Sequence, residues 1–228
     1  MSPPDLDIEH LSESDLHALA NAQETDWATL DLIVKYYLTE ELLLQKVVAH
    51  PNVRKTTLNY IRLFVPALLA ASLGLSQVSP EIFTPEAEEA FERERVVAIS
   101  QLKIPEKIHL AMKGNREART LLLKDPNRLV SLAVLESPKI TDEEIEKVAQ
   151  SKNMQEEVLR TVARNPAWIR RYPVIEALAN NPKTPLSLSI SFLKSLRGKD
   201  LERLSKNKGI PSALRNTAIK MLESKKTK

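Results

Sequence analysis

Short apolar runs with helical spacing recur along the chain, and each ends in a polar turn that usually contains proline. In one run, Ile145 and Val148 share a face, and the capping box Thr141–Glu144 opens it. The run that follows Pro185 repeats this spacing. The pattern predicts many short amphipathic helices, which end near prolines 51, 126, 138, 166 and 182.

The spacing of the turns predicts how these helices are grouped. One series recurs at intervals of 27, 29 and 29 residues, at Pro126, Asn153, Pro182 and Pro211. A second series lies between them at intervals of 28 and about 31 residues, at Pro138, Pro166 and residues 197–198. Each interval has room for two short helices and their turns. We therefore predict an all-α fold without a sheet, a right-handed α-solenoid of two-helix repeats of about 28 residues each.

The amino-terminal part carries the same pattern more faintly. Pro51 and Pro80 are 29 residues apart, so residues 48–83 form one degenerate repeat. Residues 76–84 are a candidate hinge, and a helix is expected from Pro85 to about Gln101. Side-chain caps are expected at Ser12, Thr25, Thr39 and Thr184. The predicted organisation is an amino-terminal helical region (1–84), a connecting charged helix (85–103), regular repeats (104–224) and a basic tail (225–228).

The longest apolar stretch, residues 63–75, contains Pro66 and Gly74 and is too short to span a bilayer. We expect it to form a pair of core helices, although an exposed apolar face that dimerises is an alternative. The acidic amino terminus lacks the basic and apolar regions of a signal peptide. These features predict a cytoplasmic protein without membrane insertion, and they leave its oligomeric state open.

Charge and cysteine content narrow the possible functions. Residues 1–100 carry 7 basic against 16 acidic residues, whereas residues 101–228 carry 26 against 14. A basic half of this kind attracts an anionic partner. The chain contains no cysteine, which excludes disulfides, thiolate metal sites and cysteine nucleophiles.

Sequence signatures of catalysis are missing. The four histidines show none of the spacings of zinc ligands. His50 stands directly before a turn proline, where a capping role explains it, and His109 is placed to pair with Glu106 on the same helix. No phosphate-binding glycine loop or nucleophile elbow occurs. We predict that the protein is not an enzyme and has no catalytic, cofactor-binding or metal-binding residues and no cofactor.

Asparagines recur in the turns, and two interpretations fit them. They could form a ladder that grips an extended peptide, or they could cap helix ends, because asparagine side chains readily bond to nearby backbone groups. We favour capping for this set, which comprises Asn153, Asn165, Asn180, Asn181 and Asn207.

The densest aromatic and basic cluster lies at residues 168–172. Trp168 and Tyr172 could stack on bases or anchor a protein partner, or Trp168 could fill the gap where Pro173 breaks a helix. Basic residues near helix carboxyl ends are favoured without any partner. The candidate partner surface comprises Arg164, Trp168, Arg170, Arg171, Tyr172, Arg197, Lys199 and Arg203.

The proline turns and paired helices resemble those of the HEAT-like and leucine-rich-repeat-variant families. Residues 104–222 are similar to the helical-repeat region of bacterial proteins of uncharacterised function, through the segments KGNREAR (113–119), DPN (125–127), NPKTPL (181–186) and DLERLS (200–205). The resemblance implies a fold and no activity. Some leucine-rich-repeat variants hold an iron–sulfur cluster on cysteines, and this chain has no cysteine for one.

A repeat array without a catalytic constellation predicts a protein-binding scaffold or adaptor, with another protein as the expected partner. The alternative is a nucleic-acid-associated helical-repeat protein that uses the basic carboxy-terminal half. A helical-repeat hydrolase or glycosylase would need a carboxylate buried in the basic groove, and the sequence does not place one.

Overall fold

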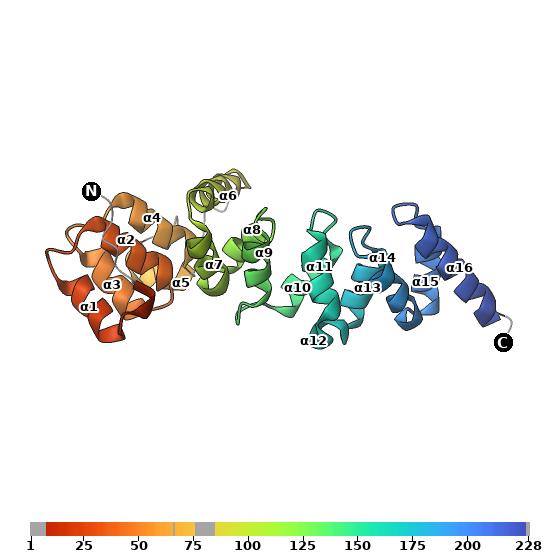
Figure 1. Cartoon of the computed structure of the whole chain (residues 1–228). Coiled ribbons are helices and arrows are strands. Elements are labelled where there is room, and N and C mark those ends of the chain that lie inside the picture. Colours follow the sequence, from red (N-terminus) through yellow and green to blue (C-terminus); the bar gives the residue numbers. More distant parts are fainter. Residues whose placement is uncertain (1–7, 66, 76–84, 227–228) are drawn as a thin grey trace. The chain divides into compact units, whose positions relative to one another are not determined.

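A computed structural model describes residues 8–65, 67–75 and 85–226, and every regular element in these ranges is a helix (Figure 1). No strand occurs within them, so the predicted all-α class is confirmed. The chain divides into two compact units, Met1–Leu122 and Leu123–Lys228. None of the described helices has the length and apolar composition needed to cross a membrane.

Unit 1 begins with a short 3₁₀ helix, η1, and contains helices α1 to α8. α2 packs against η1, α3, α4 and α7, while α1 packs on α3, and α6 packs on α4. Leu30, Ile33, Leu44, Ile61 and Phe64 are fully buried between them. The bounds are η1 (Ile8–His10), α1 (Glu13–Asn21), α2 (Trp27–Tyr36), α3 (Glu41–Ala49), α4 (Lys55–Phe64), α5 (Ala67–Ser72), α6 (Pro85–Ser100), α7 (Ile104–Lys113) and α8 (Arg116–Leu122).

Unit 2 contains helices α9 to α16 and the 3₁₀ turn η3. Here too a helix often packs on the next but one: α11 lies against α9 and α13, and α14 lies against α16. α10 packs on α13, and α15 lies beside α16 (Figure 1). The bounds are α9 (Arg128–Leu135), α10 (Asp142–Gln150), α11 (Glu156–Arg164), α12 (Pro166–Ile169), α13 (Tyr172–Asn180), α14 (Leu186–Phe192), η3 (Leu193–Ser195), α15 (Gly198–Lys206) and α16 (Ser212–Lys226).

Several predicted boundaries are confirmed. The helix expected from Pro85 is α6, and the break expected at Pro173 separates α12 from α13. Ser12 and Thr141 cap α1 and α10 as predicted. Each side chain accepts a hydrogen bond from the backbone N–H of the residue three positions later. The candidate hinge at 76–84 lies outside the described residues, as do the last two residues of the predicted tail, whereas α16 continues to Lys226.

Three predicted caps are wrong. The cap of α2 is Asp26, whose carboxylate accepts the N–H groups of Ala28 and Thr29, because the Thr25 hydroxyl instead donates to Leu19 O at 2.6 Å. α3 begins after Glu40, which makes no capping bond, rather than at Thr39. Thr184 does not cap α14 either, since Pro185 precedes that helix and the Thr184 hydroxyl is buried without a hydrogen-bond partner.

The residues before five of the turn prolines, at positions 51, 126, 138, 166 and 182, make the same hydrogen bond. Each side chain accepts the backbone N–H of the second residue after its own, in a compact turn that fixes the helix end. Asn207 makes this bond without a following proline, to Gly209 N at 2.9 Å. The capping interpretation is confirmed for Asn165, Asn181 and Asn207. The other acceptors and distances are His50 Nδ1 (3.1 Å), Asp125 (2.8 Å), Ser137 (3.4 Å), Asn165 (2.9 Å) and Asn181 (3.0 Å).

Two of these turns also bond to a turn about 30 residues earlier in the chain. Asn181 Nδ2 donates to Ala149 O at 2.7 Å and to Ser151 O at 2.9 Å, across 32 and 30 residues. His50 Nε2 lies 2.9 Å from Ala22 O, across 28 residues. These contacts satisfy carbonyl groups that a helix end leaves without a partner inside the helix. His50 therefore occupies the place in its turn that Asn181 occupies in another.

The apolar stretch 63–75 contributes to the core, as predicted. Leu63, Phe64 and Val65 are buried at the end of α4, and Ala70 is buried in α5. Gly74 lies two residues after the end of α5, and its φ of +69° is the left-handed conformation that glycine adopts without strain. Gly74 N and the following N–H bond back to the last turn of α5, which gives this helix a Schellman ending.

The predicted pair between His109 and Glu106 does not form. The Glu106 carboxylate instead bonds to Lys35 Nζ at 3.1 Å and accepts Lys103 N at 2.8 Å. His109 Nε2 lies 3.5 Å from a carboxylate oxygen of Glu9, and its ring packs on Tyr36. Burial lowers the pKa of His109, against the opposing effect of the Glu9 charge.

Replacing His50 tests the role of this turn in stability. His50→Ala removes both side-chain bonds, so we expect the free energy of unfolding to fall by about 1–3 kcal/mol in urea titrations followed by circular dichroism. His50→Asn should retain more stability than His50→Ala, because Asn181 makes the equivalent bonds. Gln45→Ala, at an exposed site on α3, serves as the control. Equal unfolding midpoints for His50→Ala and the wild type would contradict this role.

Candidate functional site

The candidate partner surface predicted from the sequence lies within unit 2. Its residues come from the end of α11, from α12 and the start of α13, and from α15 with its cap. Trp168 is half-buried, as are Arg171 and Tyr172. The remaining members are exposed: Arg164, Arg170, Arg197, Lys199 and Arg203.

Tyr172 joins α13 to α15. Its hydroxyl donates to the Asp200 carboxylate and accepts Arg197 N at 3.1 Å, while the Arg197 guanidinium lies 4.4 Å from the centre of the ring. Arg203 pairs with Asp200 at 2.9 Å and also with Glu176. Burial and the hydrogen bond to Asp200 raise the pKa of Tyr172 above its usual value. Tyr172, Arg197 and Arg203 therefore form one network, in which Arg203 is ion-paired and the Arg197 guanidinium lies over the Tyr172 ring.

The other predicted residues do not join this network. Arg171 pairs with Asp142 on α10 at 3.2 Å. Among the residues that the structure describes, no carboxylate forms an ion pair with Arg164, Arg170 or Lys199. The predicted surface is thus divided between side chains that hold helices together and three exposed cations.

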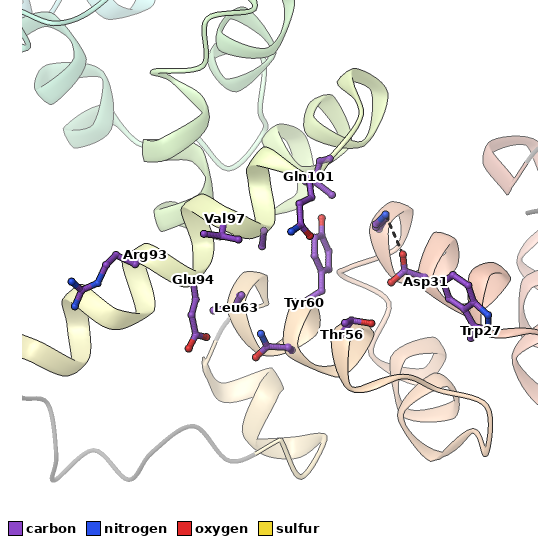
Figure 2. Close-up of a pocket in the computed structure, with 13 residues that line it drawn as sticks. Trp27, Asp31, Thr56, Tyr60, Leu63, Arg93, Glu94, Val97 and Gln101 are labelled. Carbon is purple, nitrogen blue, oxygen red and sulfur yellow. Dashed lines mark ion pairs between the residues drawn. The ribbon is translucent and has the colours of Figure 1, made fainter. Parts of the chain in front are cut away.

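A cleft in unit 1 has the stronger features of a binding site. It lies between α2, α4 and α6 and has a volume of about 580 Å³, within the usual range of ligand sites (Figure 2). Its apolar lining is supplied by Trp27 from α2, Tyr60 and Leu63 from α4, and Val97 and Leu102 from α6 and the turn after it. Its polar lining comprises Asp31, Lys35, Thr56, Asn59, Arg93, Glu94 and Gln101.

A charged network forms one wall of this cleft. Lys35 Nζ lies 3.1 Å from Asp31 and 3.1 Å from Glu106, and the Thr57 hydroxyl donates to Asp31 at 3.0 Å. Burial alone would lower the pKa of Lys35, but the charge of Asp31 and the hydrogen bonds to both carboxylates outweigh it and raise the pKa. Lys35 and Asp31 are thus satisfied by one another and by their neighbours.

Tyr60 differs from these groups because its hydroxyl has no partner. The residue is 7% exposed, and its hydroxyl makes no hydrogen bond with any described residue. Its ring packs edge-on against Phe64, with 4.7 Å between the ring centres, and extends from α4 into the space between α2 and α6 (Figure 2). Burial and the nearby charges of Glu106 and Asp31 raise the pKa of Tyr60 far above its usual value. The hydroxyl therefore stays protonated and can donate a hydrogen bond to an acceptor.

The rim of the cleft exposes apolar surface beside cations. Trp27 is 41% exposed, and Val97 is 57% exposed. The Arg54 guanidinium lies 3.6 Å from the centre of the Trp27 ring. Two contacts hold α6 on α4: Arg62 pairs with Glu94 at 2.6 Å, and Arg95 Nε donates to Leu63 O at 3.2 Å.

The sequence analysis missed this cleft. The residues of the cleft come from three segments of the chain, α2, α4 and α6, which no local motif connects. In the helix 85–100 the most conspicuous pattern is the charge of the first turns, whereas the cleft residues lie in the later turns. No local signal points to the cleft, because adjacent apolar residues such as Val96 and Val97 can both lie on the buried face of a helix, as Ile33 and Val34 do in α2.

No protein-family model, no curated protein and no solved structure matches this chain. The described residues also contain no group of three or more His, Asp or Glu side chains placed to hold a metal ion.

Removing the Tyr172 hydroxyl tests whether the predicted cluster is structural. Tyr172→Phe breaks the bonds to Asp200 and Arg197, so we expect unit 2 to lose about 1 kcal/mol of stability. With Trp27→Phe as the background, the fluorescence of Trp168 alone reports urea unfolding of this unit. Lys199→Ala, an exposed change on α15, should leave the midpoint unchanged. A midpoint that Tyr172→Phe does not move would show that the network contributes nothing to folding.

Proposed function

We propose that this chain is a non-enzymatic protein-binding scaffold. In this proposal its helices form a right-handed α-solenoid of two-helix repeats of about 28 residues, and the cleft between α2, α4 and α6 receives part of another protein. Catalysis is not part of the proposal.

The periodic contacts within each unit support the solenoid. Helices pack on the next but one in both units, as α1 does on α3 and α11 does on α13. Side-chain bonds recur at separations of one repeat, for instance 28 residues between Tyr172 and Asp200 and 30 residues between Gln155 and Asp125. In a repeat protein each repeat contacts its neighbours, so side-chain bonds across about one repeat length are expected.

The observation that carries the binding proposal is the exposed apolar lining of the cleft. Trp27 and Val97 stay open to solvent at its rim, although a folded chain usually buries such side chains. Contiguous exposed apolar surface with a polar border is a common feature of protein interfaces. Trp, Tyr and Arg are also the residues that most often dominate binding energy, and Trp27, Tyr60 and Arg54 meet here.

Affinity capture with cleft variants tests this proposal. The tagged wild-type protein should retain a reproducible partner from lysate of its own cells, and Val97→Asp should lose it because a charge then lines the apolar cleft. Leu42→Asp is the matched control, because Leu42 is 69% exposed on α3 and does not line the cleft. Circular dichroism checks that both variants fold. Capture of the same proteins by Val97→Asp, or of none by the wild type at any salt concentration, would refute the proposal.

Nucleic-acid binding is the second candidate function, favoured by the charge of unit 2. This unit carries 21 Lys and Arg residues against 12 Asp and Glu residues. Arg164, Arg170 and Lys199 are exposed there and free of ion pairs with described residues. The engagement of Tyr172, Arg197 and Arg203 within the protein weakens this candidate, since those side chains are already neutralised or stacked.

Fluorescence anisotropy with labelled DNA and RNA separates the two candidates. If nucleic acid is the partner, binding at low salt should weaken steeply as salt rises, and the triple change Arg164→Glu, Arg170→Glu and Lys199→Glu should weaken it further. The scaffold proposal predicts no binding that depends on these three cations. Salt-sensitive binding lost in the triple variant would therefore favour the nucleic-acid function.

A further inference from the structure

The cleft contains a buried hydrogen-bond donor that the protein itself does not use. Tyr60 is 7% exposed and its hydroxyl has no partner, whereas the neighbouring Asp31 and Lys35 are engaged in ion pairs and hydrogen bonds. Buried hydroxyl groups without a partner are uncommon, because their loss of water is uncompensated. An occupant of the cleft that carries an acceptor would supply the missing bond.

The start of α4, beside the cleft, carries unpaired positive charge. α4 begins at Lys55, directly after Arg54, and both cations are exposed without an ion pair among the described residues. Arg54 makes no capping bond, so the first N–H groups of α4 add the positive end of the helix dipole. Thr56 from this same end lines the cleft, and Arg54 lies on Trp27 at its rim. This local charge contrasts with unit 1 as a whole, which has 12 basic against 18 acidic residues.

We propose that the cleft binds an acidic, amphipathic segment of a partner protein. An apolar side chain of the segment lies against Val97, Leu63 and the Trp27 ring. An acceptor group of the segment accepts a hydrogen bond from the Tyr60 hydroxyl. A carboxylate of the segment pairs with Arg54 and Lys55. Charge complementarity at the start of α4 defines the acidic character, and the apolar lining defines the amphipathic one. This inference rests on the proposed scaffold function and adds the chemistry of its partner.

Selection from a library of random displayed peptides tests the charge preference. Peptides enriched on the wild-type protein should combine apolar residues with Asp or Glu, and they should bind the double variant Arg54→Glu, Lys55→Glu at least about 10-fold more weakly. Selection on that double variant should instead enrich Lys and Arg. The control is Lys152→Glu, Lys183→Glu, which changes two exposed cations of unit 2 and should leave the affinities as in the wild type.

Tyr60→Phe tests whether the Tyr60 hydroxyl serves binding rather than folding, because the variant should lose affinity without losing stability. Removing the unpartnered hydroxyl should leave the stability of the free protein unchanged or higher, because no bond is lost. The affinity for the selected acidic peptides should nevertheless fall by about 3- to 10-fold. With Trp168→Phe as the background, the Trp27 fluorescence reports the binding.

Failure of this inference can be distinguished from failure of the scaffold proposal. The enriched peptides can compete with the captured partners that Val97→Asp loses and yet lack acidic residues, or they can bind the Arg54→Glu, Lys55→Glu variant as tightly as the wild type. In either case the proposed partner chemistry is wrong, and the scaffold proposal stands. If no peptide is enriched and affinity capture also fails, both proposals fall. If light scattering shows that the wild type is a dimer and Val97→Asp is a monomer, the occupant is a second copy of the chain. If octanoate alone raises the melting temperature, the occupant is a free fatty acid. Either result overturns the inference.

Discussion

The structure depends on one recurrent hydrogen bond, from a backbone N–H to the side chain two residues before it, at turns where helices end. Proline fixes the backbone of that turn and removes a donor, so the preceding side chain must satisfy what remains. Where that residue is His50 or Asn181, it also bonds to a carbonyl 28 or 32 residues earlier. A single side chain thus ends one helix and ties it to an earlier turn of the chain.

The cleft is lined by one long helix, α6. α6 is 16 residues long, longer than the short helices before it, and it packs on α4 through Arg62 and Arg95. The face of α2 that carries Trp27 and Asp31 consequently remains open toward α6, and the charged network around Lys35 closes one side of the space. The cleft therefore exists because α6 packs on α4 and leaves this face of α2 uncovered.

The sequence predicted the all-helical class, the extent of α6 and α10 and the capping role of Asn165, Asn181 and Asn207, because each depends on neighbours within a few residues. It failed where long-range contacts decide. Thr25 lost its expected cap to Asp26 because its hydroxyl bonds to the end of the preceding helix, and Glu106 pairs with Lys35, 71 residues away, rather than with His109. The cleft was invisible for the same reason, since Trp27, Tyr60 and Val97 become neighbours only in the fold. Two-helix repeats and their handedness remain a prediction.

Two tyrosines show why residue type alone could not locate the site. Tyr172 lies in the densest aromatic and basic cluster of the sequence, yet its hydroxyl is occupied on both sides by Asp200 and the Arg197 backbone. Tyr60 stands in an unremarked helical stretch, yet its hydroxyl is buried without a partner in a cleft with an exposed rim. Trp, Tyr and Arg serve helix packing and partner binding equally well, so their clustering does not separate the two roles. What separates them is whether the folded chain satisfies their polar atoms, because a polar atom that it leaves unsatisfied is available to a partner.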